Sequence, residues 1–175
     1  MKAHSIEPTM YPAKSFADAR GWLRKLEPVA NSLAFATPTS FNDFYVSRSG
    51  RNVFRGLHVQ RFPHLQWKFI RIISGAIIAY MLNLDSESEH FKQVYSFQLE
   101  AEDGSALLCP PLHGNGFLAL SNDTTIAVLS SGEFQPSSEL VISPATVAGI
   151  DLPADCTISA KDSGGIDLRR FRGFS

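Results

Sequence analysis

The sequence predicts an all-β protein built as an antiparallel sandwich or barrel. Short apolar stretches, rich in β-branched and aromatic residues, recur from position 41 onward. Gly, Pro, Asn, Asp and Ser separate these stretches, and no segment with a helical period lies between them. Many short strands at such spacing are typical of sandwiches and barrels. The length of 175 residues predicts one domain, residues 1–175, with its core at about 16–162.

The elements follow in chain order. Residues 15–27 carry a turn signal at Asp18 and Gly21 within a weak helical pattern, and residues 28–40, small and polar with two prolines, predict extended or irregular chain. Strict alternation in residues 94–99 predicts a half-buried strand, whereas the polar tail, 153–175, is expected to wrap the barrel as an appendage or to fray. Strands are expected at 44–46, 53–55, 68–73, 76–84, 93–99, 106–109, 116–120, 125–129 and 139–142.

Composition narrows the classes of function. A formal net charge of −1 argues against a nucleic-acid-binding or anionic-lipid-binding protein. No apolar run reaches the roughly 18 residues that a membrane span needs, and the N-terminus has no apolar core, so no signal peptide is expected. Cys109 and Cys156 lack a metal-binding or redox spacing, which predicts reduced thiols in a cytoplasmic protein.

One stretch combines groups that can do acid–base chemistry. Residues 55–60 read RGLHVQ, so Arg55 and His58 lie close together, and Lys68 follows ten residues after the histidine. A base, a fixed cation and an anion anchor are the parts needed to remove a proton from carbon next to a ketone. Each residue alone also fits a structural role: a core histidine, an edge lysine or a surface arginine.

Other site chemistries find less support. A histidine pair that could hold a metal is broken by Gln60, and His64 and His113 fall in predicted turns, so no metal site is expected. No GxSxG motif supports a serine nucleophile. Residues 162–165 (DSGG) could cradle phosphate, but they follow no clear strand and open no helix, which favours a loop.

Several stretches, weak singly, match one known family in order and spacing. They are DARGW (18–22), SRS (47–49) with VFRGLHVQ (53–60), QWKFIRIISG (66–75), GFLALS (116–121), GIDLP (149–153) and SAKD (159–162). On these residues the chain resembles the dTDP-4-dehydrorhamnose 3,5-epimerase family across residues 16–162. The resemblance implies a cupin-like jelly roll, or double-stranded β-helix, with an N-terminal arm and a C-terminal tail.

The resemblance also implies roles for matching residues. His58 looks like the base that removes the proton from carbon 3, and Asp162 like its orienting carboxylate. Lys68 matches the lysine that stabilises the enolate oxygen at carbon 4. Arg20 and Arg55 match arginines that grip the nucleotide diphosphate.

The chain departs from the family pattern at four positions. Val128 stands where the family has its catalytic tyrosine, and valine cannot donate a proton. Phe134 replaces a second tyrosine, Asn115 replaces a histidine, and Asn83 replaces an acidic residue. The double epimerisation is therefore in doubt.

The remaining expectations concern substrate contacts and alternatives. Tyr45, Gln60, Asn115 and Phe134 are expected to contact substrate, and Tyr45 is a possible substitute for the missing tyrosine, although an ordinary packed aromatic is the competing interpretation. Three outcomes stay open. The first is an epimerase that acts at one carbon, with water or another residue returning the proton. The second is a related keto-sugar reaction such as that of a 3,4-ketoisomerase, which Gln60 argues against because it breaks a paired-histidine motif, and the third is a non-catalytic sugar-nucleotide binding protein. The resemblance implies a homodimer, with exchange of an early strand as one route. It also implies a nucleotide-diphosphate 4-keto-6-deoxy sugar as substrate and no cofactor. The implied setting is the synthesis of cell-envelope polysaccharide, such as lipopolysaccharide or O-antigen, or of glycosylated metabolites.

Overall fold

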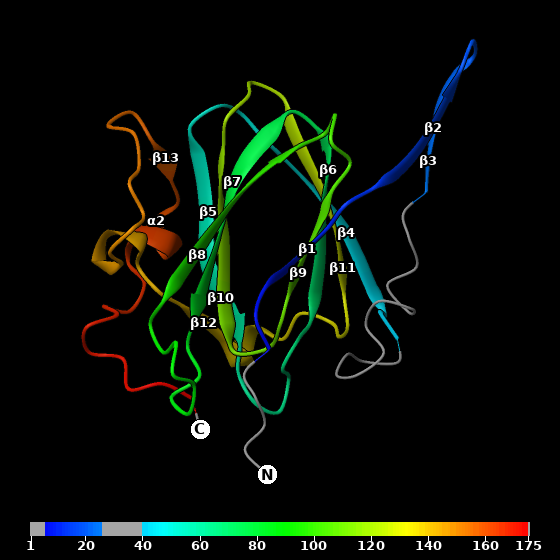
Figure 1. Ribbon diagram of the computed structural model, residues 1–175. Coiled ribbons are helices and arrows are strands. Elements are labelled where there is room, and N and C mark those ends of the chain that lie inside the picture. Colours follow the sequence, from blue (N-terminus) through cyan, green and yellow to red (C-terminus); the bar gives the residue numbers. More distant parts are fainter. Residues whose placement is uncertain (1–5, 26–39, 175) are drawn as a thin grey trace.

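The computed structural model describes residues 6–25 and 40–174, which form two β-sheets packed face to face (Figure 1). One sheet has the strand order β1-β9-β6-β11-β4, and the other has the order β12-β5-β10-β7-β8, with β13 running parallel to β5. The strands of the two sheets are β1 (Thr9–Tyr11), β4 (Asp43–Ser49), β5 (Val53–Gln60), β6 (Lys68–Ser74), β7 (Ala76–Asn83), β8 (Val94–Glu100), β9 (Ala106–Cys109), β10 (His113–Ala119), β11 (Thr124–Ser130), β12 (Glu139–Val141) and β13 (Thr157–Ile158).

The prediction of an all-β jelly roll is confirmed, and each of the nine strands expected after position 41 is present. The alternation in residues 94–99 is also confirmed, since Ser96 and Gln98 on β8 are exposed while Leu99 is buried. Helical structure is limited to α2 (Ala160–Ser163) and two 3₁₀ turns, Pro136–Ser138 and Pro144–Thr146, within the described ranges.

Three local predictions were wrong. The weak helical pattern in residues 15–27 is instead a hairpin of β2 (Lys14–Asp18) and β3 (Gly21–Lys25), although the turn lies where Asp18 and Gly21 predicted it. His113 begins strand β10 and does not lie in a turn. Asp162 and Ser163 belong to α2, which follows β13, where a loop was expected. Most of the irregular segment predicted at 28–40 lies outside the described residues.

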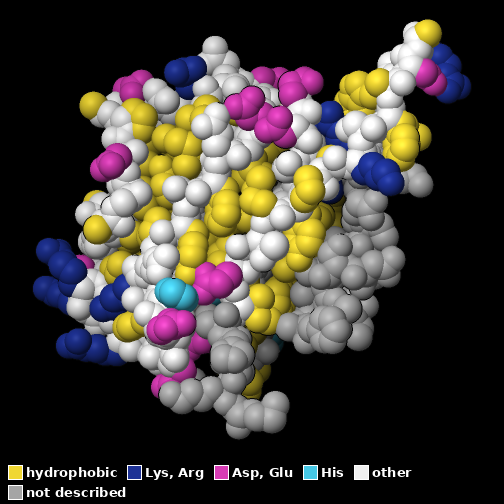
Figure 2. Space-filling view, in the orientation of Figure 1, with side chains coloured by type: hydrophobic (Ala, Val, Ile, Leu, Met, Phe, Trp, Pro, Cys, Tyr) yellow, Lys and Arg dark blue, Asp and Glu magenta, His cyan; other side chains and the backbone are white. Residues whose placement is uncertain are grey.

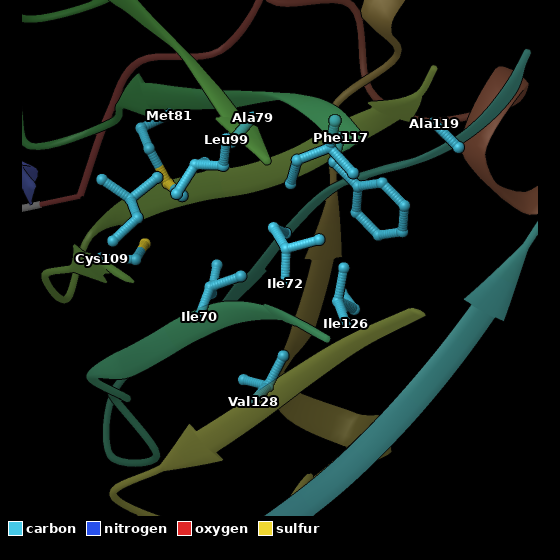
Figure 3. Packing of buried hydrophobic residues seen from close by; sticks show 12 residues of the cluster. Ile70, Ile72, Ala79, Met81, Leu99, Cys109, Phe117, Ala119, Ile126 and Val128 are labelled. Atoms are coloured by element: carbon cyan, nitrogen blue, oxygen red, sulfur yellow. The ribbon is translucent and has the colours of Figure 1, made fainter. Parts of the chain in front are cut away.

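The main core fills the space between the inner faces of the two sheets (Figure 3). Ile70, Ile126 and Val128 come from one sheet and meet Met81 and Phe117 from the other. Burying a side chain of this size contributes roughly 1.5–3 kcal/mol, so this interface contributes strongly to stability. The inner faces do not fill the whole interior, because a cavity opens at one end of the core.

The C-terminal tail covers the outer face of the second sheet and does not fray. Leu57, Leu82 and Ile142 form a second buried cluster with Leu168 from the tail, and Phe174 pairs with Asp85 at the end of the chain. This packing holds α2 beside the start of β5 (Figure 1).

The β2–β3 hairpin projects away from the two sheets as an N-terminal arm (Figures 1 and 2). Its hydrophobic side chains, including Trp22 at 63% exposure, face solvent. Arg24 ties its base to the β8–β9 turn by donating to the carbonyl oxygens of Ala101 and Glu102 at 2.7 and 2.6 Å. Among the described residues, no helix has the length and apolar character to cross a membrane.

Candidate active site

A cavity of about 680 Å³ lies between the two sheets at the end where β5 meets α2. His58, Lys68 and Asp162 line it together with Tyr45 and Val128. A second cavity of about 380 Å³ adjoins it, and Tyr45, His58 and Lys68 line both. Strands β5 and β6 together with α2 therefore bring an imidazole, an ammonium and a carboxylate to one chamber.

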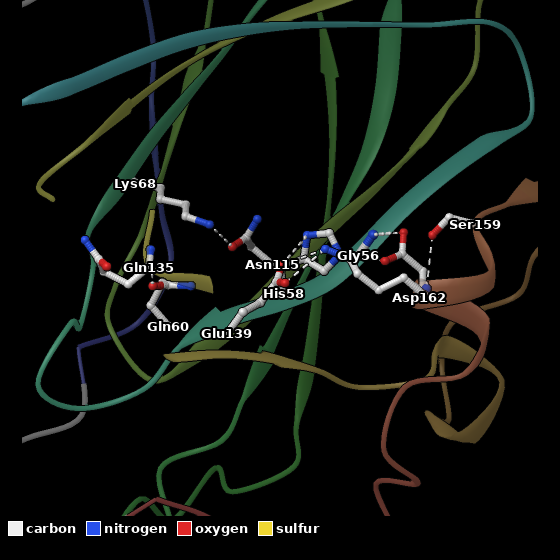
Figure 4. A network of polar contacts seen from close by, with 10 residues as sticks. Gly56, His58, Gln60, Lys68, Asn115, Gln135, Glu139, Ser159 and Asp162 are labelled. Carbon is white, nitrogen blue, oxygen red and sulfur yellow. Dashed lines mark hydrogen bonds and ion pairs between the residues drawn. The ribbon is translucent and has the colours of Figure 1, made fainter. Parts of the chain in front are cut away.

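The imidazole of His58 is hydrogen-bonded to Asp162, with 2.6 Å between Nε2 and Oδ1 (Figure 4). Asp162 is almost fully buried, at 5% side-chain exposure, whereas His58 is 28% exposed to the cavity. The second carboxylate oxygen, Oδ2, accepts from the backbone N–H of Gly56 at 3.3 Å. With both oxygens engaged, the carboxylate holds the imidazole in one orientation.

The short helix α2 fixes Asp162 in turn. Ser159 is its N-cap, and the Ser159 hydroxyl accepts the backbone N–H of Asp162 at 3.0 Å. A serine followed three residues later by an acidic residue is a known helix-start pattern. The carboxylate is thus positioned by its own backbone as well as by its hydrogen bonds.

Glycine at position 56 lets β5 approach β10 closely beside Asp162. Gly56 has φ +124°, and a Cβ atom there would lie 2.5 Å from the Cα of Gly116 and 2.8 Å from the carbonyl oxygen of Asn115. Backbone atoms at those distances cannot move aside cheaply, so only glycine fits. The backbone N–H that supports Asp162 is placed by this contact.

The contact with Asp162 engages Nε2 of His58 and leaves Nδ1 as the other ring nitrogen. A carboxylate only accepts hydrogen bonds, so Nε2 carries a proton in this contact. Glu139 on β12 approaches Nδ1 at 3.9 Å, and its carboxylate is bound by Lys161 at 2.9 and 3.0 Å. Sequence reasoning missed Glu139, because only the pairing of β12 with β5 brings it to the histidine.

Lys68 points into the cavity from the first position of β6 (Figure 4). Its ammonium donates to Oδ1 of Asn115 at 2.9 Å. Burial lowers the pKa of Lys68, and the smaller effects of Cys109 and Glu139 act in the opposite direction. The side chain is therefore a partly desolvated cation, which interacts more strongly with a developing negative charge than an exposed lysine does.

Val128 and Tyr45 lie side by side on the wall formed by β11 and β4. They are register partners, and both line the main cavity. Burial raises the pKa of Tyr45 to about 12, with further contributions from Asp43 and Cys109.

The other predicted contacts are distributed around this centre. Arg55 is exposed and lines the main cavity, with Nε donating to the Ser49 hydroxyl at 3.0 Å. Gln60 is buried and accepts the backbone N–H of Gln135 at 3.0 Å, and it lines the second cavity together with the exposed Phe134.

Three residues singled out by sequence lie elsewhere. Arg20 sits at the tip of the hairpin, paired with Asp18 at 2.5 Å, and lines neither cavity. Asn83 and His113 are buried outside both cavities. Across residues 6–25 and 40–174, no three His, Cys, Asp or Glu side chains gather as metal ligands.

Comparison with known proteins identifies related sequences and folds. A family model described as dTDP-4-dehydrorhamnose 3,5-epimerase matches residues 6–170. The dTDP-4-dehydrorhamnose 3,5-epimerase of Mycolicibacterium smegmatis is 31% identical over 107 residues, which cover 61% of this chain and 53% of that protein. The dTDP-4-dehydrorhamnose 3-epimerase of Streptomyces niveus is 28% identical over 111 residues, covering 63% and 54%. The chain thus matches about half the length of these two relatives.

A solved structure extends the similarity to nearly the whole chain. The crystal structure of dTDP-4-dehydrorhamnose 3,5-epimerase from Sulfolobus tokodaii superposes with a TM-score of 0.86 at 28% identity. That superposition covers 96% of this chain and 94% of the Sulfolobus chain.

Proposed function

This chain belongs to the dTDP-4-dehydrorhamnose 3,5-epimerase family, an isomerase family, and from this premise we propose that it epimerises a dTDP-linked 4-keto-6-deoxy sugar. The observation that carries the proposal is the 2.6 Å contact between His58 and Asp162 inside a chamber that also contains Lys68. A histidine held in one orientation by a buried carboxylate has the geometry of a general base.

The proposed reaction begins at the carbon next to the ketone. A ketone acidifies the adjacent C–H bond, so no cofactor or metal is required. Nδ1 of His58 takes the proton, and Asp162 stabilises the imidazolium that forms. The electron pair moves to the keto oxygen, where the ammonium of Lys68 stabilises the enolate.

The shape and charge of the cavity suit a nucleotide sugar. Its volume of about 680 Å³ falls within the usual range for small-molecule sites, roughly 300–1,000 Å³. Arg55 at the wall offers a planar, permanently charged fork for a diphosphate. Gln60, Asn115 and Phe134 are proposed to contact the sugar or the base, because they lie around the same chamber.

A homodimer is proposed from the exposed apolar surface. The outer face of the first sheet exposes Phe44 (62%), Val46 and Ile73, and the hairpin exposes Trp22. Exposed apolar surface of this kind marks interaction sites, and a second copy of the chain would cover it. If the hairpin crosses to that copy, Arg20 would serve the partner's diphosphate site, which accounts for its distance from the cavity of its own chain.

The proposed cellular location rests on the two cysteines, and the proposed pathway rests on the substrate. Cys109 and Cys156 are both free, which suits a reducing compartment, so we place the enzyme in the cytoplasm. A role in lipopolysaccharide or O-antigen synthesis is proposed from the family resemblance.

Proton exchange tests the function directly. The protein is incubated with dTDP-4-keto-6-deoxyglucose in D₂O, and deuterium at carbons 3 and 5 is followed by NMR. Deuterium at carbon 3 is expected, and it should be lost in a His58→Asn variant that still binds dTDP. Nucleotide binding without label at any carbon would indicate a binding protein, whereas a product with the ketone moved to carbon 3 would indicate a ketoisomerase.

A further inference from the structure

Inversion at a carbon needs two groups on opposite faces, one to remove a proton and one to deliver it. His58 lies on β5 of the second sheet, so the delivering group should come from the facing wall, which belongs to the first sheet. On that wall Val128 contributes only methyl groups and is 2% exposed. The position therefore cannot donate a proton, and inversion requires another proton donor, either water or a different side chain on this wall.

Tyr45 supplies an acidic hydroxyl beside this position. Tyr45 and Val128 are directly paired across β4 and β11, and side chains of paired residues lie on the same face of a sheet. Tyr45 also lines both cavities together with His58 and Lys68. The other three tyrosines, Tyr11, Tyr80 and Tyr95, line neither cavity.

The alternatives on the same wall are weaker. Ser47 lies two residues along β4 and also lines the main cavity, but an aliphatic hydroxyl is a far weaker acid than a phenol. The ammonium of Lys68 already donates to Asn115 and is assigned to the keto oxygen. Tyr45 is thus the hydroxyl with suitable acidity on this wall.

We propose that Tyr45 is the catalytic acid that delivers a proton to the sugar face opposite His58. The proposal rests on the proposed epimerase function. His58 breaks the C–H bond and becomes imidazolium, and the enolate electrons then return to carbon as the Tyr45 O–H bond breaks and a new C–H bond forms. Imidazolium and phenolate remain, and exchange with water restores both groups. The sugar is isomerised without oxidation or reduction.

The environment of Tyr45 is compatible with this role. The phenol is protonated at neutral pH, which is the form that an acid requires, although burial raises its pKa to about 12 and so makes it a weaker acid than an exposed tyrosine. The residue is also 39% exposed, so water can reprotonate it between turnovers.

The test compares exchange with inversion in Tyr45→Phe. Deuterium entry at carbon 3 with retained configuration reports removal of the proton by His58, and formation of the inverted sugar reports delivery from the opposite face. We expect exchange within about threefold of wild type and an inverted product reduced about 100-fold or more, with KM within about threefold. Tyr11→Phe, outside both cavities, should match wild type in both measurements.

The outcomes separate this proposal from the proposed function. Inversion at the wild-type rate in Tyr45→Phe, or in Tyr45→Leu as a second variant without the hydroxyl, overturns the role of Tyr45. A parallel fall of exchange and inversion in a variant with an unchanged melting temperature also overturns it. Wild-type protein that exchanges no proton overturns the epimerase function, and the role of Tyr45 with it.

Discussion

His58 and Asp162 are separated by 104 positions in the chain, yet their Nε2 and Oδ1 atoms are 2.6 Å apart. Two local features, one on each side of the contact, produce it. Gly56 lets β5 and β10 meet and turns its N–H toward Asp162, and Ser159 caps the helix that carries the carboxylate. The pair is therefore supported by backbone geometry, which limits the freedom of the imidazole.

Asp162→Asn should lower kcat by about 10²–10⁴-fold with little change in KM. The amide keeps the shape of the carboxylate but cannot stabilise imidazolium, so the loss falls on the chemical step. The measurement is the rate of deuterium entry at carbon 3. Asp155→Asn is the matched control, because Asp155 is an exposed residue that bonds Asn52. Equal rates in the two variants would contradict the dyad.

The pH dependence of the reaction rate should reveal the loss of the positive charge of Lys68. Since burial lowers its pKa from the ordinary value of 10.5, Lys68 loses its charge at a lower pH than an exposed lysine. The rate should consequently fall as pH rises through this lowered pKa, and kcat/KM against pH should show an alkaline limb below 10.5.

A substitution at Lys68 tests whether the charge of this residue causes the alkaline fall in kcat/KM. Lys68→Arg should move it to higher pH, because a guanidinium stays charged, although poorer geometry reduces the rate. Lys92→Met, at a lysine that packs over Phe91 outside both cavities, should leave the profile unchanged. An alkaline limb at the same pH in Lys68→Arg would assign it to another group.

Gly56→Ala should destabilise the fold by more than about 2 kcal/mol. The added Cβ would lie 2.5 Å from the Cα of Gly116 in a backbone conformation with φ +124°. Gly50→Ala is the control, since a Cβ there meets nothing within 4 Å and no positive φ is involved. Urea unfolding measures both free energies, and a difference below about 0.5 kcal/mol between the variants would contradict the argument.

The strands could be predicted because their signal is local. Alternation and β-branched residues define a strand such as β8 within seven residues. The four-residue helix α2 is too short to show a periodic pattern, and its one local signal is the spacing of Ser159 and Asp162. The hairpin was missed for a similar reason, since β2 and β3 bury little against the two sheets and carry no buried stripe.

The site could be predicted only in part. His58, Lys68 and Arg55 lie within fourteen residues of one another, and their ionisable side chains indicate acid–base chemistry. The place of Asp162 beside His58 was implied by family resemblance alone, because no local pattern shows which carboxylate reaches a strand 104 residues away. The position of Glu139 near His58 depends on the pairing of β12 with β5, a long-range contact that no sequence motif predicts.

Val128→Tyr should raise deuterium entry at carbon 5 about tenfold or more over wild type. The new hydroxyl would extend from β11 into the cavity and add a second acid on the wall that faces His58. Val128→Phe provides the control, because it adds the ring without the hydroxyl and shares the packing cost of about 1–3 kcal/mol. Exchange at carbon 5 that is the same in both variants would show that the hydroxyl does not limit the reaction.

Phe44→Glu should convert the proposed homodimer to a monomer. Phe44 is 62% exposed on β4, beside Val46 on the outer face of the first sheet, and a buried carboxylate without a partner opposes association. Phe62→Glu is the control, because Phe62 is 82% exposed in the loop between β5 and β6, outside that face. Sedimentation equilibrium measures the mass of each variant, and wild-type protein that is monomeric at micromolar concentration would contradict the dimer. If Arg20 serves the partner's cavity, monomeric Phe44→Glu should also bind dTDP more weakly than Phe62→Glu does, which links the assembly to the site.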